Sequence, residues 1–157
     1  MSNLGDPEGA TRSFRKAQAL VESRASRADA SVPDVSAYVD ASRFLSQTLV
    51  SVGQRAQAVT AARDAVTIAE RFAARHPSLD TAKELLAAGH VSAAVAAEQP
   101  DALRHWQGAL AAYESLLAER PNDPDQQGNV ATSQRTWVVR RKPAHNQIGV
   151  LAAPLPP

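Results

Sequence analysis

The chain has 157 residues, enough for one domain with a buried core and too few for an additional catalytic domain of ordinary size. Alanine accounts for 32 residues and isoleucine for two, and only 4% of the chain is aromatic, a composition that favours helices over sheets. The absence of cysteine excludes disulfides, thiolate metal sites and a cysteine nucleophile, and 17 Lys and Arg against 16 Asp and Glu leave no strong charge to attract a polyanion. We therefore expect a single all-α unit.

Six amphipathic stretches separated by short polar breaks predict six helices. Prolines and residues that cap helix N-termini mark these breaks, most clearly at Pro33, Pro77 and Pro121. In chain order, the helices are expected at residues 6–30, 34–52, 54–76, 79–97, 100–120 and 124–140. Residues 1–140 are thus predicted to form the helical domain. Residues 141–157, which end in a proline-rich stretch, are predicted to be a poorly ordered tail.

The three prolines follow one another at intervals of 44 residues, which indicates an internal repeat. Inside the repeats, a triplet with spacings of four and three residues places its members on one side of a helix. The triplets are Ala10/Phe14/Ala17, Ala58/Ala62/Ala65 and Ala102/Trp106/Ala109. Small outer residues let two helices approach closely, and short connections make neighbours antiparallel. The pattern predicts stacked antiparallel helical hairpins, about 2.5–3 repeats in all.

The residues around the second triplet resemble the tetratricopeptide repeat (TPR). In that family a large, a small and another large apolar residue precede a turn glycine and an alanine-rich second helix. Leu45, Ser46, Leu49 and Gly53 occupy these places ahead of Ala58. Residues 3–17 are the closest local match, similar to TPR regions that follow the kinase domain in some bacterial serine/threonine kinases, although the chain contains no kinase motif. The repeat of 44 residues is longer than the usual 34 of the family.

The resemblance implies an α-solenoid in which the first helix of each hairpin lines a concave groove for a peptide or protein. The outward positions that correspond by register are Asp40, Arg43, Gln47 and Val50 in residues 34–52, Glu84, Ala87 and Val91 in residues 79–97, and Arg135 in the last helix. These positions lie beside the expected packing stripe, so they should stay exposed. Their mixed charges favour neither acidic nor basic ligands, and a merely solvated face is the alternative.

The register also leaves the first helix without its expected partner, because Gly5 occupies the turn that should follow a preceding helix. The apolar side of residues 6–30, which includes Phe14, Leu20 and Val21, is therefore expected to be unpaired. We infer either that the chain is a fragment of a longer array or that it self-associates through this helix.

Residues that could carry chemistry are few. The four histidines, His76, His90, His105 and His145, lack the spacing of a metal site, and phosphate-binding and nucleophile-elbow motifs are absent, so we expect no cofactor and no catalysis. His76 is interpreted as a residue that can carry a favourable charge at a helix C-terminus, and His105 as a neighbour of Trp106 on the polar side of its helix. The acid pairs Asp29/Asp34 and Asp123/Asp125 are interpreted as helix caps.

The predicted function is a non-catalytic protein–protein interaction module with a concave helical groove. One alternative is a regulatory C-terminal segment of a larger bacterial kinase or signalling protein, and another is an enzyme of unidentified class. The N-terminus has no secretory signal and no stretch approaches the ~18 apolar residues of a spanning helix, so we expect a cytoplasmic protein without a membrane partner. Basic residues 140–142 are interpreted as the solubilised end of a helix rather than a nucleic-acid site.

Overall fold

The computed structural model describes residues 6–141, and every regular element in that range is an α-helix. The helices are α1 (Pro7–Ala25), α2 (Val32–Ser51), α3 (Arg55–Arg75), α4 (Asp80–Ala96), α5 (Asp101–Glu119) and α6 (Pro124–Arg141). The prediction of an all-α fold with six helices is confirmed. Gly5 and the predicted tail lie outside the described residues, apart from Arg141, at which α6 ends. Among the described helices, none is long and apolar enough to cross a membrane.

The first helix is shorter than predicted, because α1 ends at Ala25 rather than at residue 30. The guanidinium of Arg27 donates two hydrogen bonds to the carboxylate of Asp29, at 2.8 and 2.9 Å, within the turn that follows the helix. Ala25 and Ala30, on either side of this turn, are both buried in the core. Propensity alone would let the helix continue through this segment, but the turn buries both alanines and reverses the chain.

Side chains cap several of the helices at the predicted breaks. Ser31 and Asp34 form a reciprocal capping box at the start of α2, and the Asp123 carboxylate accepts from two backbone N–H groups at the start of α6. The interpretation of Asp34 and Asp123 as capping residues is therefore confirmed. It is wrong for Asp29, whose carboxylate pairs with Arg27 instead. Gly53, in the turn after α2, has a φ of 78°. Glycine adopts this conformation without strain because it has no Cβ.

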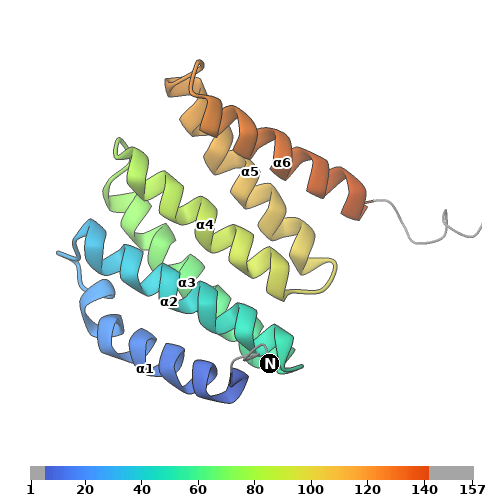
Figure 1. Ribbon diagram of the computed structural model, residues 1–157. Coiled ribbons are helices and arrows are strands. Elements are labelled where there is room, and N and C mark those ends of the chain that lie inside the picture. Colours follow the sequence, from blue (N-terminus) through green and yellow to red (C-terminus); the bar gives the residue numbers. More distant parts are fainter. Residues whose placement is uncertain (1–5, 142–157) are drawn as a thin grey trace, which may run out of the picture.

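Each helix packs against the next one in the chain, and α2 also packs against α4. Figure 1 shows the helices side by side in chain order, with α1 and α6 at opposite ends and α3 behind α2. Short connections make consecutive helices antiparallel. In the described chain each helix thus packs on its neighbours in sequence, and α2 and α4 also touch.

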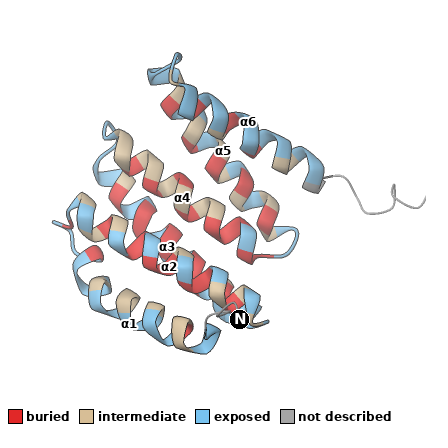
Figure 2. Ribbon diagram, in the orientation of Figure 1, coloured by how far each residue is buried: buried red, intermediate tan, exposed pale blue. Residues whose placement is uncertain are grey.

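Two clusters of buried side chains lie within α1–α4 and the connections between them, and further buried apolar residues, among them Trp106 and Leu116, lie on α5 and α6. One cluster centres on Phe72, Val35 and Leu85, and the other on Leu45 and Leu49. Figure 2 shows that the buried residues follow the sides on which neighbouring helices meet. The second and third triplets are buried as predicted, whereas the members of the first triplet are only half-buried. Alanine-rich seams therefore join the inner helices, and α1 is packed less completely.

Candidate functional site

The α2 part of the predicted binding face is largely accessible. Asp40 and Gln47 are exposed, and the half-buried Arg43 donates to the Asp40 carboxylate at 3.1 Å. The Arg43 guanidinium also lies 4.1 Å from the centre of the Phe44 ring, a cation–π contact. Val50 is half-buried against the second core cluster. This helix therefore offers a mixed surface of one ion pair, one amide and part of an apolar side chain.

The α4 part of that face is mostly engaged within the molecule. The Glu84 carboxylate accepts hydrogen bonds from Arg120 and from Gln126, each at 3.4 Å, and Val91 is half-buried. Ala87 is 0% exposed. The expectation that Ala87 stays exposed is wrong, because α2, α3 and α5 all pack around α4 and leave a short side chain no access to solvent. Arg135 is exposed on α6.

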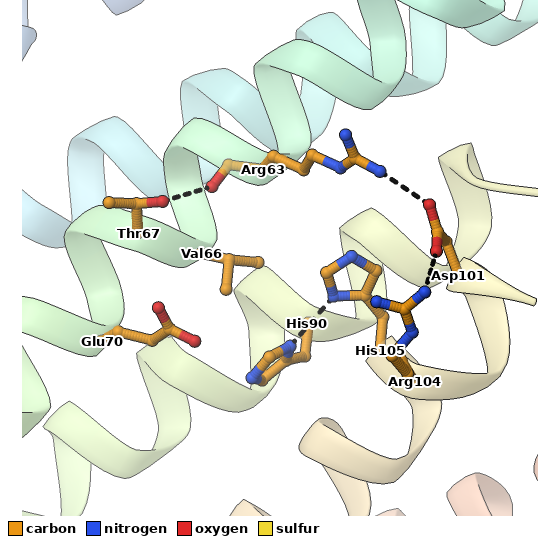
Figure 3. Close-up of a pocket in the computed structure, with 8 residues that line it drawn as sticks. All are labelled: Arg63, Val66, Thr67, Glu70, His90, Asp101, Arg104 and His105. Carbon is orange, nitrogen blue, oxygen red and sulfur yellow. Dashed lines mark hydrogen bonds and ion pairs between the residues drawn. The ribbon is translucent and has the colours of Figure 1, made fainter.

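A polar cleft that the sequence did not reveal lies between α3 and α5, beside His90 of α4 (Figure 3). Its volume is about 390 Å³, within the range of pockets that hold small ligands. The side chains that line it are Arg63, Val66, Thr67, Glu70, His90, Asp101, Arg104 and His105. Residues from three helices therefore meet in one place.

One carboxylate holds two guanidinium groups at the edge of this cleft. Asp101, in the first turn of α5, accepts from Arg63 of α3 and from Arg104 of α5, each at 2.7 Å and each at a different oxygen. An acidic residue in a first turn is favourable near the positive end of the helix dipole. Because Glu70 adds a second carboxylate, the formal charges of the cleft balance when both histidines are neutral. The cleft thus has no electrostatic preference for anions.

Two histidines meet inside the cleft. Nδ1 of His90 lies 3.2 Å from Nδ1 of His105, and the ring centres are 5.5 Å apart. Burial lowers the pKa of His90, and burial followed by the charge of His90 lowers the pKa of His105, so both rings are neutral at pH 7. Gly108 makes room for this contact, since a Cβ at that position would lie 2.6 Å from Nε2 of His90.

The pair was missed because its members are 15 residues apart on two helices, a separation that no local motif covers. The interpretation of His105 as a neighbour of Trp106 omitted its partner across the cleft. His76 is the C-cap residue of α3, as predicted, and His145 lies outside the described residues. The signal available in the sequence was Gly108, one turn after His105 on α5. A glycine inside a helix can mark the place where another group closely approaches the helix backbone.

The cleft holds two groups, His90 and His105, that can bind and release protons. Within residues 6–141 no three His, Cys, Asp or Glu side chains form a group that could hold a metal ion. The Thr67 hydroxyl donates to the backbone carbonyl of Arg63 at 3.1 Å, which directs its proton back into the helix. The two imidazoles are left as the groups whose charge changes near neutral pH.

A second cleft of about 490 Å³ lies between α1 and α3 and repeats part of this construction. There Arg15 of α1 donates to Gln57 of α3, as Arg63 of α3 donates to Asp101 of α5. Arg63 follows Arg15 by 48 residues and Asp101 follows Gln57 by 44, the same intervals that separate the corresponding triplets. The same bridge between helices therefore occurs once in each of two repeats.

No family model matches this chain, and no curated protein or solved structure is similar enough to match it. The functional conclusions below therefore depend on the geometry of the molecule.

Proposed function

We propose that the chain is a non-catalytic protein–protein interaction module, a TPR-like α-solenoid that presents the face of α2 and α4 to a peptide or protein. The observation that carries this proposal is the repeated bridge, Arg15 to Gln57 and then Arg63 to Asp101, at positions related by the sequence repeat. Equivalent contacts at equivalent intervals are typical of stacked repeats, in which each unit packs on its neighbour. The contact of α2 with α4 supports the same arrangement.

The α2 side of the face supplies the contacts in this proposal. Asp40, Arg43 and Gln47 lie on consecutive turns of one helix, two of them exposed and one half-buried. Ala87 supplies no contact, because its side chain is fully buried among the helices that pack around α4. Because both helices are held by core packing, a partner would meet a preformed surface and lose little entropy in ordering it.

A site-specific photo-crosslinking experiment tests the proposal. A photoreactive amino acid is placed at Gln47 in the full chain. A matched control carries it at Ala111, which is also exposed but lies on α5. In an extract of the native cells, we expect one protein to crosslink from position 47 and not from position 111. Equal crosslinking from both positions, or none from either, would contradict the proposal.

Charge reversal on the same face supplies a second measurement. Arg43→Glu replaces the ion pair between Arg43 and Asp40 with two neighbouring acids. We expect it to weaken binding of the crosslinked protein by about tenfold, or about 1.4 kcal/mol. The control is Arg104→Glu, which removes the separate ion pair with Asp101 on α5 and should leave this affinity unchanged. Equal losses in both variants would point to non-specific electrostatic attraction.

A further inference from the structure

The contact between His90 and His105 depends on how many protons the two rings carry. At a separation of 3.2 Å, one Nδ1 must donate a proton and the other must accept it, so the neutral pair forms one hydrogen bond. One additional proton can bind at Nε2 of the donor ring and leave this hydrogen bond intact. A second additional proton must bind the accepting Nδ1, and two N–H groups on two cations then face each other.

The surrounding groups offer little to offset two positive charges. Arg63 and Glu70 line the cleft from α3, and Asp101 and Arg104 line it from α5. Both oxygens of Asp101 already accept from the two arginines, so Glu70 is the carboxylate of the cleft that pairs with no other described residue. Gly108 brings the backbone of α5 against the His90 ring and restricts its retreat in that direction. Double protonation is therefore unfavourable where the rings now lie.

We propose that the His90–His105 contact is an acid-sensitive joint, at which protonation of both rings loosens α5 and α6 from α4 while α1–α4 stay folded. This inference does not depend on the proposed binding function. It follows from where the pair lies, between α4 and the last two helices of the described chain.

The response is local because α4 is also held by α2 and α3, whereas α5 and α6 join the rest of the described chain mainly through the contact between α4 and α5. On α5 the buried residues include Trp106 and Leu116, and surface ion pairs also connect this end of the molecule to α4. In a linear stack of helices, a weakened contact near one end releases that end before the rest.

Mild acid acts on the two histidines of this joint. Ion pairs also connect α5 and its C-cap residue Arg120 to α3 and α4, through the carboxylates of Asp101, Asp80, Glu84 and Glu119. The hydrogen bond from Lys83 lowers the pKa of Glu119, so the Lys83–Glu119 ion pair persists in mild acid. Both histidine pKa values are lowered in the folded protein, so the stabilisation is complete above about pH 6.5 and decreases as the pH falls.

Hydrogen exchange measured by mass spectrometry tests the joint on the full chain at pH 7.5 and pH 5.0. After correction for intrinsic exchange rates, we expect protection in α5 and α6 to fall by about tenfold or more at the lower pH, while α2 and α3 keep theirs. His105→Gln, which cannot form a doubly charged pair, should retain protection in both helices. His76→Gln, at the end of α3, is the matched control and should behave as the wild type.

Two results would overturn the proposal: an equal loss of protection in all helices, or the same loss in α5 and α6 of His105→Gln. If that variant does not fold, His90→Gln replaces it, and an NMR titration of the wild-type imidazoles provides an independent measurement. The two rings should titrate below pH 6.5, together with the loss of protection in α5. Titration of both rings at or above pH 6.5 would also refute it.

Discussion

Replacing Trp106 with alanine should destabilise the protein by about 3–5 kcal/mol. Trp106 is only 7% exposed on α5, which packs against both α4 and α6. A tryptophan side chain of roughly 200 Å², removed from water at about 25 cal/mol per Å², is stabilised by about 5 kcal/mol. The small neighbours that let the helices approach cannot expand into the space, so the change leaves a cavity in this seam.

The indole N–H of Trp106 reduces that value, because it is buried and donates to no acceptor within the described part of the chain. An unsatisfied buried donor costs about 1–3 kcal/mol. Trp106→Phe removes this donor and keeps most of the apolar ring, so we expect it to change the stability by no more than about 1 kcal/mol. The two substitutions therefore separate the contribution of the ring from that of its nitrogen.

Urea unfolding followed by far-ultraviolet circular dichroism measures these differences without using the altered tryptophan as the probe. The control is Trp137→Ala in α6, where the side chain is only half-buried, and we expect a loss of about 1 kcal/mol. The argument would fail if Trp106→Ala cost no more than Trp137→Ala. It would also fail if Trp106→Phe were as destabilising as Trp106→Ala.

Three further substitutions or titrations test other parts of the fold. Gly53→Ala should lower the free energy of unfolding in urea by about 1–2 kcal/mol, because the φ of Gly53 is 78°. Gly128→Ala, in a helix with free space around this position, should raise it by about 0.5–1 kcal/mol. Equal effects of the two substitutions would refute the role of the turn at Gly53. An alanine Cβ at position 89 would lie 3.4 Å from Cα of Val66, so Gly89→Ala should be tolerated. The larger Gly89→Leu should lower the free energy of unfolding by about 1–3 kcal/mol. Equal melting temperatures of the two variants would contradict this. Burial raises the pKa of Tyr38 to about 12, so the contribution of the neutral phenol to folding stability is complete below pH 10 and is lost as the pH rises toward 12. An ultraviolet titration of the folded protein, with Tyr38→Phe to identify the signal, would contradict this if Tyr38 ionised at pH 10.

The binding face and the acid-sensitive joint would be separable properties of one chain. The proposed contacts lie on α2, within the part that the core clusters hold together, whereas the joint lies between α4 and α5. Loss of α5 and α6 would therefore remove one end of the stack and leave Asp40, Arg43 and Gln47 in place. Acid would change how far the interaction surface extends without abolishing it.

Much of the fold could be predicted from the sequence because its determinants are local. Capping residues such as Asp34 and Asp123, the turn at Gly53 and the spacing of apolar residues each act within about one helical turn. Together they indicated six helices, with boundaries within two residues of those observed except at the end of α1. The repeat was also visible, since the prolines recur every 44 residues and the triplets at intervals of 48 and 44 residues whether or not the chain is folded.

What only the tertiary structure decided depends on how helices rotate and cross. The burial of Ala87 requires α2, α3 and α5 around α4, and the end of α1 depends on a turn that buries Ala25 and Ala30. The contact of His90 with His105 requires two helices to meet at one height, beside Gly108. Periodicity shows which residues share a side of one helix, but the side chains that they meet are determined by packing between helices distant in sequence.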